Sequence, residues 1–276
     1  MLRARRLAST VVAASLAVGG LSACDSESSV AAYLGDAGQV SEREVQRIWD
    51  ESYPDFVAQA QAEAQAEAQE ANQAQRMNEE ARRSAGQEVV PSPAVVPSPA
   101  QVSISRADIV DELVARELYK RVAAERSITL PAQVPYAEEA AQRKLPADSE
   151  YTKLYIDNLY LQSLLIQSFL SETPPTDADM LEVYNSLSAN GGVEPGQDFT
   201  TWLSLQSDQN RQVVAASAKV REQVEAAADE LNVRVNPRYQ PLDVSVLEIQ
   251  GESDPLQLLG TDLGIEQQPV PVADVP

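Results

Sequence analysis

Residues 58–101 constrain the fold most, because they lack the large apolar side chains from which a core is built. The segment begins with AQAQAEAQAEAQEANQAQRMNEEARR, which has high helix propensity but almost no large apolar residue. It ends with VVPSPA twice in succession, at Val89–Ala94 and Val95–Ala100, and four prolines in so short a stretch favour a stiff, extended chain. We therefore predict an insertion, in which a solvated helix, or alternatively a disordered run, leads into a proline-rich linker.

The residues on either side of this insertion, 30–57 and 102–240, have the apolar spacing of packed helices. Aromatic residues make up only 5% of the chain, so the core should be modest and mainly aliphatic. Short strand patterns occur near both ends, at 30–34 and 233–235, and unpaired strand backbone is costly. The predicted fold class is therefore mainly α, a helical domain in which the first and last elements form a two-stranded pairing.

The segment Tyr151–Leu170 is the most apolar predicted helix after the N-terminal region, and it has two apolar stripes. The second stripe contains Ile156, Tyr160 and Leu164 at a spacing of four residues. Two stripes fit a central helix that packs on both sides, which is the usual fate of such helices, or a helix with one face free for a partner. We take Ile156, Tyr160 and Leu164 as the candidate residues for contact with a partner.

The N-terminus combines three arginines, a short apolar run at Leu7–Leu21 and a cysteine after two small residues. The run is too short and too interrupted for a comfortable transmembrane helix. The pattern resembles bacterial lipoprotein signals, which implies removal of residues 1–23, lipidation of Cys24 and a tether at 24–29. The alternative is an ordinary secretory signal with a free cysteine. The expected location is the outer face of the cell membrane, reached through a lipid anchor.

After Tyr239 the chain is acidic and contains scattered proline and glutamine. Such compositions cannot bury enough apolar surface to offset the entropy of ordering. We therefore predict that residues 241–276 form a disordered acidic tail.

The chain has no histidine, and Cys24 is its only cysteine. This excludes Ser-His-Asp and Cys-His catalysis, imidazole metal sites and cysteine clusters. A Gly-rich phosphate loop is also missing. We predict a protein that is not an enzyme, with no catalytic residue, no metal, no cofactor and no nucleotide.

The net charge of −21 becomes −24 once the predicted signal and its three arginines are removed. A surface so negative repels nucleic acid and anionic lipid headgroups. Nucleic acid is therefore excluded as a partner, and a soluble, solvated surface is expected.

The order of elements resembles the N-terminal chaperone domain of the SurA and PrsA foldases, as found in actinobacterial lipoproteins. The matching residues are Ala32–Asp36 with a capped helix after Val40-Ser41, the Thr-Asp start at Thr176–Tyr184, and the closing strand at Leu231–Tyr239. The resemblance covers 30–57 and 102–240. The chain departs from it in having Gly-Asp-Ala-Gly-Gln after the first strand, in the insertion, and in lacking a parvulin-type isomerase domain.

This resemblance implies an ATP-independent chaperone that shields apolar segments of unfolded or exported polypeptides. A second hypothesis is a structural or adaptor lipoprotein that binds one dedicated envelope partner, through the same surface or through the proline-rich insertion. A third, a residual prolyl isomerase, is disfavoured because acid–base catalysis usually recruits histidine.

Overall fold

The computed structural model describes residues 29–100, 102–172, 174–250 and 255–263. The predicted signal at 1–23, the lipidation site Cys24 and most of the tether at 24–29 lie outside these residues. So does the end of the predicted tail, at 264–276.

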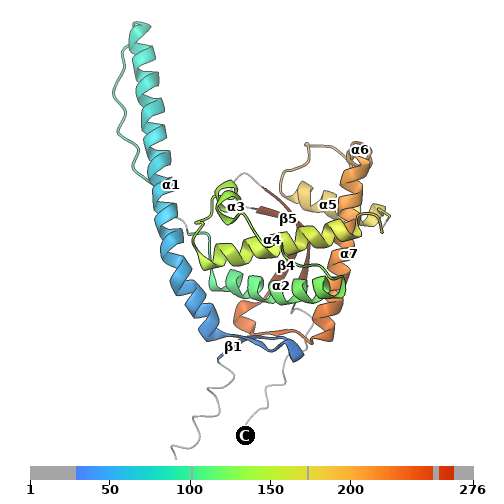
Figure 1. The fold of residues 1–276 in the computed structure, drawn as a ribbon. Coiled ribbons are helices and arrows are strands. Elements are labelled where there is room, and N and C mark those ends of the chain that lie inside the picture. Colours follow the sequence, from blue (N-terminus) through green and yellow to red (C-terminus); the bar gives the residue numbers. More distant parts are fainter. Residues whose placement is uncertain (1–28, 101, 173, 251–254, 264–276) are drawn as a thin grey trace, which may run out of the picture.

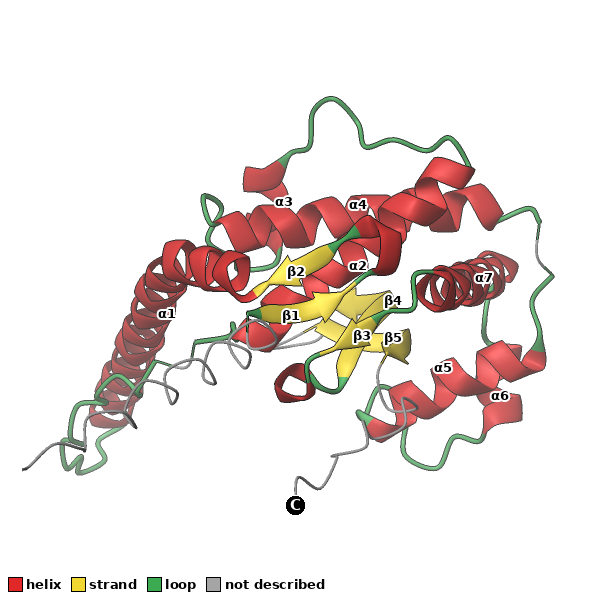
Figure 2. Cartoon of the chain, turned by 90° about the horizontal axis from the view of Figure 1, so that it is seen from below, coloured by secondary structure: helices red, strands yellow, loops and turns green. Residues whose placement is uncertain are grey.

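The described chain is mainly helical, with two small antiparallel sheets (Figures 1 and 2). Its helices are α1 (Glu42–Ser84), α2 (Arg106–Glu125), α3 (Tyr136–Gln142), α4 (Glu150–Phe169), α5 (Asp177–Ala189), α6 (Phe199–Ser204) and α7 (Asp208–Glu230). Its strands are β1 (Val30–Tyr33), β2 (Gln39–Ser41), β3 (Arg234–Val235), β4 (Leu242–Gln250) and β5 (Pro255–Leu263). The mainly α fold class is thus confirmed, and the specific SurA-type fold stays a hypothesis.

The predicted pairing of the strand patterns at 30–34 and 233–235 is confirmed, but the second of them is not the last element, because β4 and β5 follow it. Strand β1 pairs antiparallel with β3, Ala32 opposite Val235, and β2 joins the other edge of β1 as a third strand that the sequence analysis missed. The turn after β1 lies against the end of α7, where a Cβ on Gly35 would stand 2.4 Å from the carbonyl oxygen of Leu231. Gly35 has a φ of +52°, so glycine is required there for both space and conformation. This sheet therefore holds the start of the chain against the end of α7.

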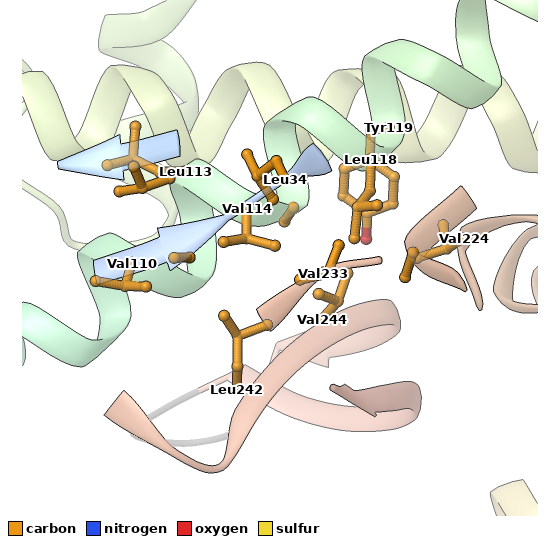
Figure 3. Close-up of a cluster of buried hydrophobic side chains, with 14 of the residues drawn as sticks. Leu34, Val110, Leu113, Val114, Leu118, Tyr119, Val224, Val233, Leu242 and Val244 are labelled. Carbon is orange, nitrogen blue, oxygen red and sulfur yellow. The ribbon is translucent and has the colours of Figure 1, made fainter. Parts of the chain in front are cut away.

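Helix α2 is the centre of the main core. Its residues Val110, Val114 and Leu118 are fully buried, and they meet apolar residues of β1, α4, α7 and β4. Figure 3 shows α2 side chains converging with Leu34, Val233, Leu242 and Val244, together with Val224 of α7. A second, smaller core joins α5, α6, α7 and β5 around Met180, Val183, Trp202, Val214, Ala218, Leu258 and Leu259.

The prediction of a disordered tail is wrong for residues 242–250 and 255–263, which form the β4–β5 hairpin. Leu242, Val244 and Val246 are fully buried against the helices. They alternate with polar residues at the period of a strand, a signal that the acidic composition of the region obscured. Val246 and Leu258 stand at breaks in the pairing register, which bend the hairpin around the helical surface.

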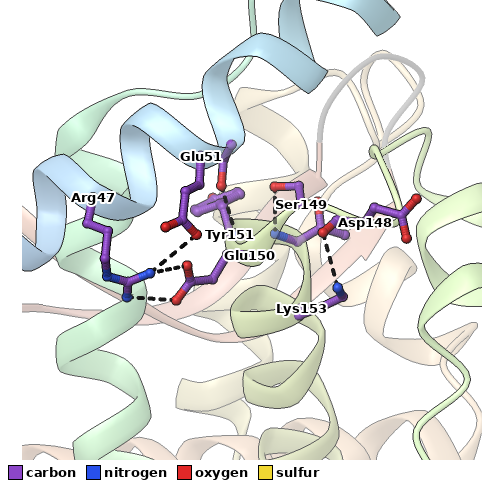
Figure 4. Close-up of polar contacts among 9 residues, drawn as sticks. Arg47, Glu51, Asp148, Ser149, Glu150, Tyr151 and Lys153 are labelled. Atoms are coloured by element: carbon purple, nitrogen blue, oxygen red, sulfur yellow. Dashed lines mark hydrogen bonds and ion pairs between the residues drawn. The ribbon is translucent and has the colours of Figure 1, made fainter.

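The first half of α1 is fixed to the N-terminus of α4 (Figure 4). The hydroxyl of the fully buried Ser52 accepts the backbone N–H of Tyr151 at 3.1 Å, which satisfies one of the free donors at the start of α4. Beside it, Arg47 donates to the carboxylate of Glu150, with Nη2 and Oε1 2.8 Å apart. The hydrogen bond from Arg47 lowers the pKa of Glu150, but these groups are well exposed and the ion pair should stabilise the fold only slightly.

The second half of α1 projects from the helical body as an arm (Figures 1 and 2). It is a continuous helix to Ser84, so the predicted helical extension holds and its disordered alternative does not. The proline-rich segment, which forms no regular secondary structure, runs back along it. The side chain of Asn72 donates to the carbonyl of Val95 and accepts the N–H of the same residue, at 2.8 and 2.7 Å, and Glu79 accepts the N–H of Ser92 at 2.8 Å. The arm is therefore held together by polar contacts rather than by a core.

We expect the arm to be dispensable for folding, because Ala68 is the only buried residue among residues 58–100. Replacing residues 61–99 by a short Gly/Ser linker should leave the thermal midpoint within about 3 °C of the wild type. Circular dichroism melting measures this. A broad transition, or a midpoint lowered by more than about 10 °C, would show that the arm packs on the body after all.

A candidate site between two helices and the hairpin

Three elements meet around one cavity, which encloses about 220 Å³. Helix α2 contributes one face, on which residues recur every three or four positions. Helix α4 contributes a second face with the same spacing, and the hairpin closes the third side. The lining residues are Asp108, Asp111, Glu112, Ala115 and Tyr119 from α2, Tyr151, Tyr155, Asn158, Leu159 and Gln162 from α4, and Asp243, Ser245, Glu248 and Gln257 from the hairpin.

Side chains of both helices hold the hairpin at this cavity through its backbone. The hydroxyl of Tyr119 and the amide of Gln162 both donate to the carbonyl oxygen of Ser245, the latter at 3.1 Å. Tyr119 is 2% exposed and Gln162 7%, so both donors are buried and paired. These contacts fix the depth at which β4 sits between α2 and α4.

Asn158 links the two helices and leaves one oxygen unused. Its amide nitrogen donates to the backbone carbonyl of Glu112 at 2.8 Å and to the carboxylate of Glu112 at 2.6 Å. Because both contacts need the NH₂ group, the orientation of the amide is fixed. The Oδ1 atom of this residue, which is 4% exposed, has no hydrogen-bond partner within the described chain.

Five carboxylates line the cavity, and only one of them has a cationic partner among the described residues. Glu248 pairs with the guanidinium of Arg143 at 3.2 Å and accepts the hydroxyl of Tyr155 at 2.6 Å. Asp243 accepts two hydrogen bonds from the amide of Gln257, and Asp108 accepts the backbone N–H of Ser105. The Oδ1 atom of Asp111 has no partner.

Burial and mutual repulsion favour the neutral forms of the two inner acids. The pKa of Asp111 is raised to about 8, chiefly by burial and also by repulsion from the nearby carboxylates of Asp108 and Glu112. Burial likewise raises the pKa of Glu112 to about 7, although the hydrogen bond from Asn158 opposes this. The pKa values of Tyr119, Tyr151 and Tyr155 are raised for the same reason, so all three hydroxyls stay protonated at neutral pH.

This arrangement offers acceptors and aromatic faces to a bound group. Within the described residues, no three acidic or cysteine side chains are placed to hold a metal ion. The unused oxygens of Asp111 and Asn158 are themselves closed off from solvent, so they lie behind the surface of the cavity.

The residues proposed for partner contact lie elsewhere on α4. Ile156 is fully buried, so it belongs to the interior and cannot contact a partner in this conformation; for this residue the free-face alternative is wrong. The reason is α3, which packs on this side of α4. Tyr160 donates from its hydroxyl to Glu139 of α3 at 3.1 Å, and Tyr160 and Leu164 are half-buried. None of the three residues lines the cavity.

Sequence reasoning missed the cavity, although a signal for it was present. Asn158 and Gln162 are polar residues four positions apart within the most apolar predicted helix. Buried polar side chains require partners, so this pair marks a polar seam inside the core. On α2, Asp111 and Glu112 stand between two pairs of apolar residues, Ile109-Val110 and Leu113-Val114.

We expect stability to fall as pH rises from 5 to 8. The raised pKa values of Asp111 and Glu112 mean that the folded state binds protons more tightly than the unfolded chain, so raising the pH through this window favours unfolding. Asp111→Asn should remove part of this slope and stabilise the protein at pH 8 by about 1–3 kcal/mol. Urea unfolding at pH 5, 6.5 and 8 measures the slopes.

Glu117→Gln is the matched control, because Glu117 stands on the same helix outside the cavity and pairs with Lys120 at 3.0 Å. It should leave the pH dependence unchanged. Equal slopes for Asp111→Asn and the wild type would mean that Asp111 is solvated and ionised in the folded state.

No helix within the described residues is long and apolar enough to cross a membrane. Comparison of the chain with models of known protein families, with curated proteins and with solved structures gives no match. The resemblance to the SurA and PrsA chaperone domain therefore remains a hypothesis that rests on the residues quoted above.

Proposed function

We propose that this protein is an ATP-independent chaperone, anchored by lipidated Cys24 at the outer face of the cell membrane, that holds apolar segments of exported polypeptides. The observation that supports this best is the way in which the helices hold the β4–β5 hairpin. An extended stretch of polypeptide lies in a helical cradle and is bound partly through its backbone.

The backbone contacts are the feature that suits a cradle to many sequences. Tyr119 and Gln162 donate to the carbonyl of Ser245, and the hydroxyl of Ser186 donates to the carbonyl of Leu258 at 3.2 Å. Every residue of a client carries such a carbonyl, so these donors do not select for particular side chains.

The apolar contacts supply the affinity. Leu242, Val244 and Val246 are fully buried in the main core, and Leu258 and Leu259 are buried in the second core. At about 25 cal/mol per Å² of apolar surface, burial of a few hundred Å² supplies several kcal/mol before ordering costs are subtracted. This free energy is enough to hold a client transiently, provided that the hairpin leaves the cradle.

In this mechanism the hairpin and the client compete for one cradle. The hairpin covers the apolar surface when no client is present, which keeps the free chaperone soluble, and the acidic surface adds to its solubility. The client displaces the hairpin without nucleotide, and rebinding of the hairpin releases the client.

The arm favours a second candidate function, an adaptor lipoprotein that binds one dedicated envelope partner. Its helix and its proline-rich segment form one projecting unit, in which Val90 and Val96 are about four-fifths exposed. A complex of fixed stoichiometry that is lost when residues 61–99 are replaced would favour the adaptor over the chaperone.

Cys24→Ser should move the protein from the membrane fraction to the soluble fraction of the expressing bacterium. The reason is that the lipid chains on this thiol are the proposed anchor. Immunoblotting of the two fractions measures the shift, and Ser26→Ala in the tether is the control that should stay at the membrane. Retention of Cys24→Ser at the membrane with unprocessed size would indicate an uncleaved signal anchor instead.

If the hairpin competes with clients, weakening its docking should increase holding. Val244→Ala removes fully buried apolar volume from β4, which should cost about 1–3 kcal/mol of docking free energy. The variant should then suppress the aggregation of a chemically denatured protein at a lower molar ratio than the wild type does, without ATP. Light scattering measures aggregation.

The control is Val45→Ala, an equal truncation at a fully buried position of α1 that belongs to no part of the hairpin. It should leave holding at the wild-type level, and circular dichroism checks that both variants fold. No suppression by the wild type or by Val244→Ala would refute the chaperone proposal. Equal activity of Val244→Ala and Val45→Ala would refute competition by the hairpin.

A further inference from the structure

We propose that the proline-rich segment of the arm, residues 89–100, is a preformed ligand for a second protein that has a groove lined with aromatic side chains and a basic residue at the end that meets Glu88. The groove would receive a ridge formed by Val90, Pro93, Val96 and Pro99. This inference rests on the adaptor candidate, for which it names the chemistry of the partner, and it does not depend on the chaperone proposal.

Proline restricts most of this segment to one extended conformation. Each of its four prolines fixes its own φ angle and also excludes the helical region for the residue before it. Residues 89–100 accordingly form neither helix nor strand. The conformation that these restrictions favour is polyproline II, which has about three residues per turn and rises about 3.1 Å per residue. Side chains three positions apart therefore share a row, and the segment has three rows.

One row holds the segment against α1 (Figure 1). The backbone N–H of Ser92 donates to the carboxylate of Glu79 at 2.8 Å. Both backbone polar groups of Val95, three residues further on, pair with the side chain of Asn72. The members of this inner row are Val89, Ser92, Val95 and Ser98.

The other two rows are entirely apolar and are not used to hold the segment. In the ridge, Val90 is 82% exposed and Val96 is 80% exposed, whereas Val95 of the inner row is 44% exposed. No charged residue stands within residues 89–100, although the chain has a net charge of −21. Rows of proline and aliphatic side chains on a polyproline II helix are the surface that aromatic-lined grooves bind. The remaining row contains Pro91, Ala94, Pro97 and Ala100.

The sequence repeat sets the dimensions of the groove. Val90 and Val96 occupy equivalent positions in the two VVPSPA repeats, so the same surface occurs twice. Six residues of polyproline II span about 19 Å. The partner should therefore have an elongated groove with two similar apolar pockets at this spacing, rather than one deep pocket.

The contacts with α1 lower the cost of binding. A free proline-rich linker needs no attachment to a helix, yet Asn72 and Glu79 hold this one through its backbone and leave its apolar rows uncovered. A ligand that is ordered before binding loses less conformational entropy on binding. The attachment therefore suits a segment that is displayed to a partner.

Charge favours a protein partner over a lipid surface. Residues 58–101 contain six acidic and three basic residues, whereas helices that lie on membranes have basic polar faces. Glu88 directly precedes the segment, is exposed, and has no ionic partner among the described residues. A basic residue at one end of the groove would pair with it and fix the direction in which the segment lies.

Site-specific photo-cross-linking of the full chain in its native host tests the inference first. The cross-linker p-benzoyl-phenylalanine replaces Val96 of the ridge in one experiment. In the matched control it replaces Val95, the adjacent valine on the inner row. We expect Val96 to give a product with one other protein, in much higher yield than Val95. Mass spectrometry should map the product to a surface of that protein with at least two aromatic residues.

Calorimetry with the purified partner and the full chain in mild detergent then measures the contribution of each row. Changing Val90→Ser and Val96→Ser together should weaken binding by about tenfold or more, because both pockets lose their apolar contacts. The matched change of Val89→Ser and Val95→Ser should have little effect. Asn72→Leu removes the attachment of the segment and should weaken binding severalfold. A peptide VVPSPAVVPSPA should compete, and a scrambled peptide of the same composition should not.

Several results would overturn the inference. These are equal or absent cross-linking from Val96 relative to Val95, a product with lipid or with a second copy of this chain, and a partner surface without aromatic residues. Full binding by the Val90→Ser, Val96→Ser variant, when replacement of residues 61–99 abolishes binding, would place the contact on α1 and leave only the adaptor role. None of these readouts involves aggregation, so failure here is distinguishable from failure of the chaperone proposal.

Discussion

The structure depends on the packing of one helix, α2, in the middle of the main core. It packs against α1, α4, α7, the N-terminal sheet and β4, and nine of its residues are buried. Its Glu117 and Lys120 form an ion pair on the solvent side, but Asp111 and Glu112 in its second turn line the cavity beside α4 and the hairpin. Burying charged groups is costly unless they are paired, so the neighbouring elements must leave room or supply partners there. The cavity and its contacts from Asn158 follow from that requirement.

The sequence was informative where local patterns decide structure. Ser105 and Asp108 form a capping box at the start of α2, as a serine followed three residues later by an acid indicates, and Asn232 after α7 adopts the left-handed conformation that asparagine tolerates, with a φ of +48°. The pairing of β1 with β3 was also predictable, because these were the two strand patterns recognised in the sequence and unpaired strand backbone is costly. The sequence analysis did not recognise β2, which covers the other edge of β1.

The hairpin and the cavity were not predicted, for different physical reasons. The hairpin has a strand signal in Leu242, Val244 and Val246, but its net acidity suggested a solvated tail. The net charge of such a strand reflects the polar residues on its outward face, whereas its burial depends only on the apolar residues on its inward face. The cavity depends on which faces of α2 and α4 approach each other, and periodicity within one helix does not specify this. Only the helical spacing of Asn158 and Gln162 indicated a polar seam.

The hairpin has two roles, because it fills the cradle and also forms one wall of the cavity. Asp243, Ser245, Glu248 and Gln257 reach the cavity only while β4 and β5 are docked. The docked Asp243 is among the charges that raise the pKa of Asp111, so docking of the hairpin and protonation of Asp111 favour each other. A client in the cradle would require the undocked hairpin. By thermodynamic linkage, protonation of Asp111 would then weaken binding of the client. The buried acids of α2 therefore couple the proposed cradle to pH.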